Sequence, residues 1–232
     1  METILREGFA QLGVAIPETA PALLRGYYEY LTERNQVMNL TAIEGEEDTA
    51  RLHFLDCGAM LQYVPLEGKT LLDVGSGAGF PGLVLKILSP TTKITLLDSL
   101  QKRVAFQQEV CEKLALTNIR CIAGRVEEVP DIRGRFDVVT SRAVARLNTL
   151  CEFCLPMAKV GGVFAAMKGP TPEEELEEAA KAIRLLGGKL ERVEKYTVPG
   201  TDATHSVVII QKIAPTPAKY PRRFAQIKKQ PL

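Results

Sequence analysis

Several features are missing from this sequence of 232 residues. No apolar run approaches the roughly 20 residues that cross a bilayer, and the first residues, METILREGFA, lack the apolar core of a secretory signal peptide. An excess of charge of one sign is missing too, because 29 basic and 28 acidic residues leave a net charge of +1. The net charge therefore does not indicate a class of binding partner. The lack of a membrane-spanning run and of a signal peptide predicts a cytoplasmic protein away from membranes.

Cysteine is sparse, with five residues, and an odd number in an unsecreted chain indicates reduced thiols. Cys151 and Cys154 form a CxxC, but they lie inside a helical pattern and no second pair follows. Small buried apolar residues are therefore the preferred interpretation over a zinc or redox site, and no metal is expected. Internal repeats and low-complexity segments are also absent.

The patterns that are present divide the chain into three parts. Residues 1–64 predict an N-terminal helical cap, and residues 46–64 form one of its amphipathic helices. Residues 65–213 alternate strands with helices, and their last two runs, joined by PGTDAT, predict an antiparallel hairpin. Residues 214–232 form a basic tail with no core pattern. The expected fold class is α/β, a mostly parallel sheet that ends in a hairpin. Its first five strands are TLLDVG, KITLLD, IRCIAG, FDVVTS and VFAAMK.

The segment LLDVGSGAGFPG, residues 71–82, joins the first strand to a helix. Glycines let a backbone turn sharply and approach a ligand closely, and ligands of open α/β sheets bind beyond the carboxyl ends of the strands. Asp98 ends the second strand, where a carboxylate can accept hydrogen bonds from both ribose hydroxyls. The pair of features predicts a nucleoside cofactor. The alternative is a glycine turn that only permits tight packing of strand against helix.

Asp73, just before the glycines, narrows the choice of nucleoside. A carboxylate there would repel the pyrophosphate of a dinucleotide, whereas S-adenosylmethionine has no phosphate and carries a cationic sulfonium and amino group. An NAD-type oxidoreductase is thus disfavoured, and the chain shows no separate substrate domain for one. With its terminal hairpin, the segment 66–213 resembles the class I S-adenosylmethionine-dependent methyltransferases, which have a Rossmann-like seven-stranded sheet.

The methyl acceptor should face the end of the fourth strand, FDVVTSRAVARL. The Asn/Asp-Pro-Pro-aromatic clamp used for exocyclic amines is absent, and Cys151 and Cys154 do not lie in the strand-end Pro-Cys context of a carbon methyltransferase. Guanine N7 needs neither device, because it attacks with its own lone pair. Arg142 and Lys168 are the expected catalytic residues, acting through orientation and electrostatics without a general base.

Seven motifs, spread over nearly the whole chain, carry a closer resemblance. They are NLTAI (39–43), RLHFLDC (51–57), VGSGAGFPG (74–82), RVEEVP (125–130), SRAVA (141–145), MKGP (167–170) and TPAKYPRR…KKQPL (216–232). In this order they resemble the RsmG family of bacterial 16S rRNA guanine-N7 methyltransferases, also called glucose-inhibited division protein B. Ala225 and Ile227 replace a glycine and a proline of the family's tail.

The resemblance implies S-adenosyl-L-methionine as cofactor and N7 of one guanine in the small-subunit decoding region as acceptor. It implies a monomer whose partner is 16S rRNA or the small ribosomal subunit. The rival, a non-catalytic RNA-binding module, is disfavoured by the intact glycine loop and Asp98. The expected cofactor-binding residues are Asp73, Gly75, Gly77, Gly79, Phe80, Asp98, Ser99, Leu100, Val126, Glu127 and Arg142. The expected RNA contacts are Asn39, His53, Arg125, Lys219, Arg222 and Arg223.

Each assignment has a purely structural alternative. Asp73 would cap amides of the turn, Arg142 would pair with a carboxylate, and Phe80 would belong to the core. His53 would pack between helices, and Asn39 would cap a turn. The basic tail would be a solvated, disordered end.

Overall fold

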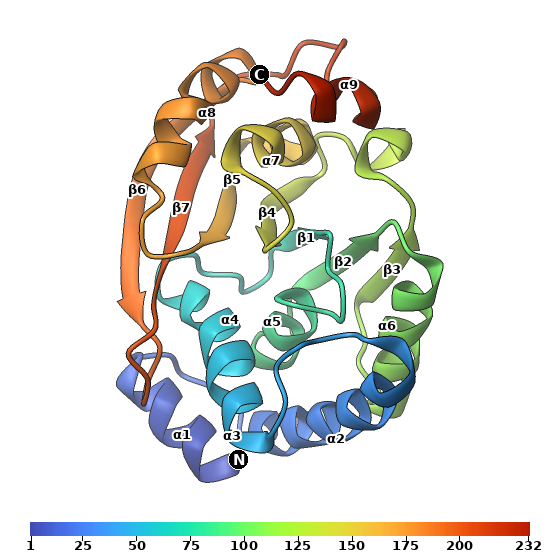
Figure 1. Ribbon diagram of the computed structural model, residues 1–232, viewed down its shortest axis with the longest axis vertical. Coiled ribbons are helices and arrows are strands. Elements are labelled where there is room, and N and C mark those ends of the chain that lie inside the picture. Colours follow the sequence, from blue (N-terminus) through green and yellow to red (C-terminus); the bar gives the residue numbers. More distant parts are fainter.

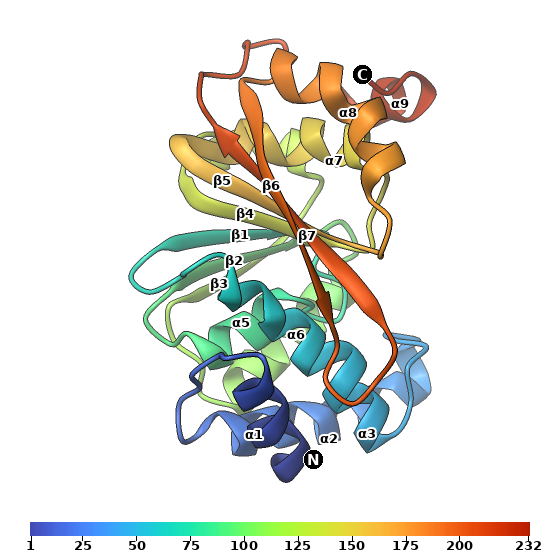
Figure 2. The ribbon, with the colours of Figure 1, turned by 90° about the vertical axis from the view of Figure 1, so that its left-hand side faces the viewer.

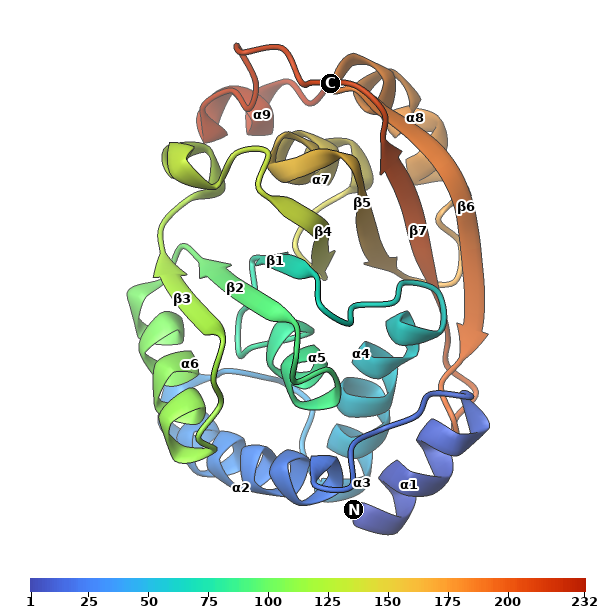
Figure 3. The ribbon, with the colours of Figure 1, turned by 180° about the vertical axis from the view of Figure 1, so that it is seen from behind.

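A computed structural model describes residues 1–232 and places one sheet between two layers of helices (Figure 1, Figure 2). The sheet has seven strands in the order β3-β2-β1-β4-β5-β7-β6. β7 is antiparallel to both neighbours, and the other pairs are parallel. The strands are β1 Thr70–Val74, β2 Lys93–Asp98, β3 Ile119–Ala123, β4 Phe136–Arg142, β5 Ala158–Lys168, β6 Gly188–Thr197 and β7 Thr204–Lys212. The predicted fold class is confirmed, and Figure 3 shows β3 and β6 at the two edges.

Alternation along the strands divides the core between the two faces of the sheet. Leu71 and Val138 pack on one face, and their neighbours Leu72 and Val139 pack on the other. Because both faces are covered by helices, the central strands are apolar on both sides and read as nearly continuous hydrophobic runs. The ends of β1, β2, β4 and β5 consequently emerge from the core at one edge, where a ligand can reach them.

One layer consists of the N-terminal helices and the two helices that follow β1 and β2. They are α1 Glu2–Gln11, α2 Ala20–Met38, α3 Glu46–Asp48, the π-helix η1 Thr49–Leu55, α4 Asp56–Ala59, the 3₁₀ turn η2 Met60–Gln62, α5 Gly82–Leu88 and α6 Gln101–Lys113. A single cluster of 35 buried residues runs from Met1 through these helices to the sheet. The segment 1–64 therefore shares its core with the strands. None of the helices in the chain combines the length and the apolarity needed to cross a membrane.

The segment 46–64 departs from the single α-helix that its apolar spacing predicts. Its middle turns, Thr49–Leu55, form a π-helix between two short α-helical pieces. Apolar spacing does not separate the two forms, because both keep residues three to five positions apart on the same side. π turns occur frequently at functional sites, and this one carries His53.

The other layer contains α7 Leu147–Cys154, η5 Leu155–Met157, α8 Glu173–Leu185 and α9 Phe224–Lys229, with the 3₁₀ turns η3 Val126–Glu128 and η4 Pro130–Ile132. Cys151 and Cys154 are fully buried there. The tail shows no core pattern in its sequence, yet its Tyr220 and Ile227 are buried in the cluster of this layer. Apolar side chains scattered singly among prolines and cations give no periodic signal.

Candidate active site

The glycine loop, residues 75–81, connects β1 to α5 and lies against the end of β2. The amides of Gly75 and Ser76 both donate to the Leu97 carbonyl, at 2.8 and 3.1 Å. Gly75, Gly77 and Gly79 all have positive φ, at 75°, 56° and 103°, a region that side chains rarely adopt. A Cβ on Gly79 would also lie 2.8 Å from the Tyr27 hydroxyl. The loop thus requires glycine for its conformation and for its close packing on α2.

Asp98, at the end of β2, joins the glycine loop to the start of α6. Its Oδ2 accepts from the Gly77 amide at 2.8 Å, and its Oδ1 accepts from the Leu100 amide at 2.9 Å. The Arg103 guanidinium lies 3.6 Å from Oδ2. Ser99 and Leu100 follow at the surface. The carboxylate is therefore held rigidly at the edge where the sequence predicts a ribose.

Asp73 lies beneath the glycine loop, fully buried. Its Oδ2 accepts from the Gly82 amide at 2.8 Å, so it caps the first turn of α5 as the structural alternative expects. Its Oδ1 has no hydrogen-bond partner in the chain. Burial raises the pKa of the Asp73 carboxyl to about 7. The side chain supports the loop, and its Oδ1 is a buried acceptor without a partner.

Arg142, at the end of β4, is held by the π-helix and the residues after it. It donates from Nη1 to Asp56 Oδ2 at 2.9 Å and from Nη2 to His53 Nδ1 at 2.7 Å. Phe80 stacks on the His53 ring, with centroids 4.1 Å apart, and lies 5.0 Å from the guanidinium carbon. Phe80 is also buried in the core, as its structural alternative expects, and its contact with a cofactor stays a prediction. The ion pair expected as the alternative for Arg142 is present.

His53 is a neutral link in this cluster. Burial and the Arg142 charge lower the pKa of its imidazole to about 3. Because Arg142 can only donate, His53 accepts at Nδ1 and carries its proton on Nε2, which lies 2.8 Å from Thr41 Oγ1. The same hydroxyl accepts from the Ile43 amide at 3.0 Å. His53 thus connects the segment 39–45 to the end of β4.

Asp56, Tyr196 and His205 complete the cluster and were not predicted from the sequence. Asp56 Oδ1 lies 2.6 Å from His205 Nδ1 and 2.8 Å from the Tyr196 hydroxyl. Tyr196 and His205 are paired across the β6–β7 hairpin. The one available signal for Asp56 was its place three residues after His53, nearly one helical turn away. No local pattern joins it to the hairpin, which follows about 140 residues later in the chain.

A cavity of about 500 Å³, here called the acceptor cavity, opens at the ends of β4 and β5. Arg142, Lys168, His53 and Asp56 line it together with Glu175 from α8. Lys168 donates to the Ala145 carbonyl at 3.0 Å, and its Nζ lies 2.6 Å from Glu175 Oε2. Both predicted catalytic residues therefore border one cavity, and each is paired with a carboxylate.

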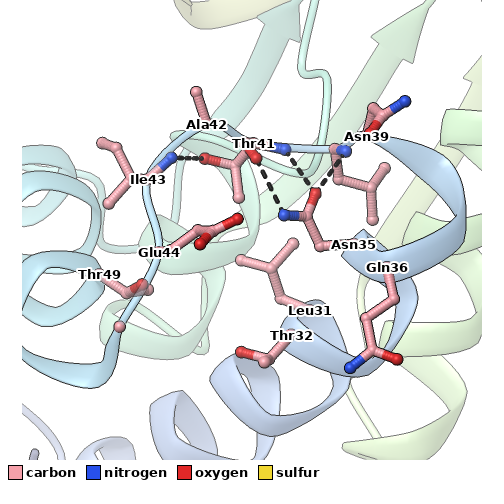
Figure 4. Close-up of a pocket in the computed structure, with 12 residues that line it drawn as sticks. Leu31, Thr32, Asn35, Gln36, Asn39, Thr41, Ala42, Ile43, Glu44 and Thr49 are labelled. Carbon is pink, nitrogen blue, oxygen red and sulfur yellow. Dashed lines mark hydrogen bonds between the residues drawn. The ribbon is translucent and has the colours of Figure 1, made fainter.

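A second cavity, of about 790 Å³, lies between the end of α2 and the segment 39–45 (Figure 4). The Asn35 side chain shapes it by accepting from the amides of Leu40 and Thr41 and donating to the Thr41 carbonyl. Asn39 ends α2 in the left-handed conformation, with φ of 49°, and is exposed. The structure gives it a helix-terminating role, and its contact with RNA stays a prediction.

The residues after β3 form the third part of the predicted site. Val126 is buried, whereas Glu127 is half-buried with an Oε1 that has no hydrogen-bond partner. Arg125 is exposed and stacks on the Phe224 ring of α9, with 4.2 Å from guanidinium carbon to ring centroid. A cavity of about 590 Å³ lies between this turn and residues 221–225.

The basic tail follows the far helical layer and is held there by one ion pair and by hydrogen bonds. Arg222 donates from Nε and Nη2 to the fully buried Glu152, at 2.8 and 2.6 Å. Arg133 donates to the Tyr220 carbonyl. Lys219 and Arg223 are exposed. Of the predicted tail contacts, Arg222 is engaged inside the protein, and the other two are free to meet a ligand.

These residues fit S-adenosylmethionine. The glycine loop offers a concave backbone, Asp98 offers a fixed carboxylate, and the unpartnered oxygens of Asp73 and Glu127 could accept from its amino or hydroxyl groups. Together with the order of the sheet, they define the chain as a class I S-adenosylmethionine-dependent methyltransferase. Residues 21–204 match the family GidB, described as rRNA small subunit methyltransferase G. The chain belongs to this family, as the motifs predict.

Comparisons with individual proteins agree with this assignment. Proteins named ribosomal RNA small subunit methyltransferase G from Alkaliphilus oremlandii and Pelotomaculum thermopropionicum are 45% and 46% identical, covering 100% of this chain and 99% and 98% of theirs. In fold, the chain is similar to TYW2 of M. jannaschii in complex with AdoMet (TM-score 0.54, 16% identity, 65% of this chain and 72% of that one). It is also similar to TrmN of Thermus thermophilus (TM-score 0.55, 19% identity, 68% and 48%). The oxidoreductase alternative is not favoured.

Proposed function

We propose that this chain transfers a methyl group from S-adenosylmethionine to N7 of a single guanine in the 16S rRNA of the small ribosomal subunit. The names of its relatives supply the substrate class, rRNA of the small subunit. The observation that supports the N7 atom is the content of the acceptor cavity: two cations, each paired with a carboxylate, and none of the five cysteines.

A cavity of this content suits an acceptor that needs no activation. Methylation of a pyrimidine carbon would require a cysteine nucleophile, yet Cys151 and Cys154 are buried in the far layer, where burial raises the pKa of both thiols. Guanine N7 brings its own lone pair and has no proton to lose. When bound, S-adenosylmethionine supplies an electrophilic methyl group. The task of Arg142 and Lys168 is then to orient the base, and the carboxylates beside them balance the charge of the cavity.

The assignment of the cofactor residues follows the three strand ends. The glycine loop and Asp73 would hold the methionine part, and Asp98 with Ser99 and Leu100 would hold the ribose. Val126 and Glu127 would flank the adenine. The Oε1 atom of Glu127 supports this assignment, because it has no hydrogen-bond donor within the chain. The amino group of adenine could supply that donor.

The RNA would be held by exposed residues around the same edge of the sheet. Arg125, Lys219 and Arg223 are exposed cations and suit phosphate contacts. Asn39 lies exposed at the second cavity, where an amide could contact a base. His53 and Arg222 would act indirectly, through Arg142 and Glu152. The proposed partner is 16S rRNA or the small subunit, which places the enzyme in the cytoplasm, and we expect it to act as a monomer without a metal.

The test uses cells that carry the wild-type gene, no gene, or the Asp98→Ala variant. Their rRNA is cleaved chemically at N7-methylguanine and read by primer extension. We expect a stop at one guanine of 16S rRNA only with the wild-type gene. Asp98→Ala should lose at least about tenfold in affinity for S-adenosylmethionine by calorimetry, because a charged hydrogen-bond partner is removed. A stop that persists without the gene would show that another enzyme makes the modification.

A further inference from the structure

The acceptor cavity adjoins the glycine loop on two sides. Phe80 of the loop stacks on His53, which lines the cavity. Val144, two residues after Arg142, packs on the other end of the loop, so that a Cβ on Gly75 would lie 2.5 Å from its Cγ2. A base in the cavity would therefore lie next to a cofactor held by the loop. Its volume of about 500 Å³ can accommodate a purine.

Two carboxylates line the cavity, but only one has an oxygen to spare. Asp56 accepts from Arg142, His205 and Tyr196, and both of its oxygens are engaged. At Oε2, Glu175 accepts from the Leu147 amide and forms an ion pair with Lys168. Its Oε1 has no partner in the chain and is not buried, so it is accessible. Glu175 is therefore the acceptor that a ligand can use.

Lys168 and Glu175 present a donor and a free acceptor oxygen side by side. Lys168 Nζ lies 2.6 Å from Glu175 Oε2, and Oε1 follows. An ammonium has three N–H groups, and the contacts of Lys168 with Ala145 and Glu175 leave one free. The Watson–Crick edge of guanine has the complementary order: O6 accepts, N1–H donates and the 2-amino group donates. Adenine has the reverse at its first two positions, a donating 6-amino group and an accepting N1.

We propose that Glu175 is the residue that selects guanine. Its Oε1, which has two lone pairs, accepts from N1–H and from the 2-amino group of the target base, while Lys168 donates to O6. This rests on the proposed function, because it takes the methylated base to be a guanine in the acceptor cavity. A contact with the Watson–Crick edge leaves N7, on the adjacent Hoogsteen edge, free to face the methyl donor.

The same contact favours the reaction as well as the correct base. The N7 lone pair forms the new N–C bond while the S–C bond breaks, and the electron pair of that bond stays on sulfur. No proton leaves, so the purine acquires a positive charge, and its N1–H becomes more acidic. The hydrogen bond from N1–H to the Glu175 carboxylate therefore strengthens during transfer, and an interaction that strengthens in the transition state increases the rate.

The test pairs Glu175→Gln with a change in the base. The variant keeps a carbonyl oxygen for Lys168 and Leu147, which directs its NH₂ group to the place of Oε1. Small-subunit rRNA is reassembled by splinted ligation with guanine or hypoxanthine at the target position; hypoxanthine lacks only the 2-amino group. We expect wild type to prefer guanine by about ten- to a hundredfold in kcat/KM. In Glu175→Gln the ratio of kcat/KM for guanine to that for hypoxanthine should fall to one or below, because the Gln NH₂ group and the 2-amino group of guanine are then two donors that face each other.

Glu174→Gln is the matched control. It lies next to Glu175 on α8, contacts Arg146 at the surface and does not line the cavity. It should keep the wild-type preference, and both variants should keep the wild-type affinity for S-adenosylmethionine, which verifies their folding. A folded Glu175→Gln that still prefers guanine as strongly as wild type would overturn the inference. Absence of N7 methylation by wild type itself would instead overturn the proposed function.

Discussion

The two histidines of the chain lie at opposite sides of one ion pair and respond to it in opposite ways. His53 touches Arg142, and burial together with that cation lowers its pKa to about 3. His205 touches Asp56, and the hydrogen bond to this carboxylate raises its pKa above the ordinary 6.5. At neutral pH, therefore, His53 is neutral and serves as an acceptor, and His205 is the histidine that can take up a proton.

The pH dependence of stability follows from the directions of these shifts. His53 contributes stability above the ordinary pKa of 6.5, and this contribution is lost as the pH falls toward about 3. The reason is that between these two values the unfolded chain binds a proton at His53 and the folded chain does not. His205 contributes stability below 6.5, and this is lost as the pH rises through its raised pKa. The two contributions oppose each other, which makes bulk stability a poor probe of either residue.

Proton NMR of the imidazole Hε1 signals measures the titration of His53 and of His205 separately. We expect one histidine to titrate above pH 6.5 and the other to show no titration down to about pH 4, because its pKa is near 3. His205→Gln assigns the signals by removing the titrating one. In urea both should return to the ordinary value. A folded protein in which both histidines titrate near 6.5 would show that the cluster around Arg142 does not form in solution.

At the scale of elements, the tail shows how two neighbouring arginines differ in role. Arg222 is paired with the fully buried Glu152, whereas Arg223 is exposed and begins α9. Removing the tail at Ala218 would also remove the buried Tyr220 and Ile227, and loss of RNA binding would then be mixed with loss of packing. Substitution of single arginines separates the two effects.

We expect Arg222→Ala to destabilise the protein by about 3 kcal/mol, because it leaves a buried carboxylate with only the backbone amide of residue 222 as its partner. Arg223→Ala should change stability by less than about 0.5 kcal/mol and lower the salt slope of RNA affinity by about 0.7–0.9. Urea unfolding and RNA affinity at several salt concentrations are the two measurements. An unchanged salt slope in Arg223→Ala would assign the phosphate contact to other cations, such as Arg125 or Lys219.

At the scale of the whole molecule, the N-terminal helices are part of the catalytic unit. The cluster of 35 residues joins α1 and α2 to the strands, and the buried Tyr27 hydroxyl of α2 donates to the Ala78 carbonyl in the glycine loop. His53 and Asp56, from the segment before β1, hold Arg142 at the end of β4. Folding of the segment 1–64 should therefore be coupled to the formation of the cofactor site.

This coupling predicts a single cooperative unfolding transition. Cys57 is buried in the layer of the N-terminal helices and Cys154 in the far layer, so labelling of the two thiols with increasing urea reports on both sides of the sheet. We expect the same urea midpoint for the two thiols, because neither layer can open without exposing the strands between them. Labelling of Cys57 at clearly lower urea would instead make the N-terminal helices a separate folding unit.

Local pattern determined much of this protein. Period-two alternation and apolar runs predict the strands within a few residues, and glycines that need positive φ mark the loop beside Asp98, because backbone conformation depends on neighbours in the chain. Only the tertiary structure brought Asp56 to His205 and Tyr196, Glu175 to Lys168, and Glu152 to Arg222. Each of these pairs joins parts of the chain that only the fold brings together. A charged side chain needs a partner when it is buried, but the sequence around it does not show which residue that partner is.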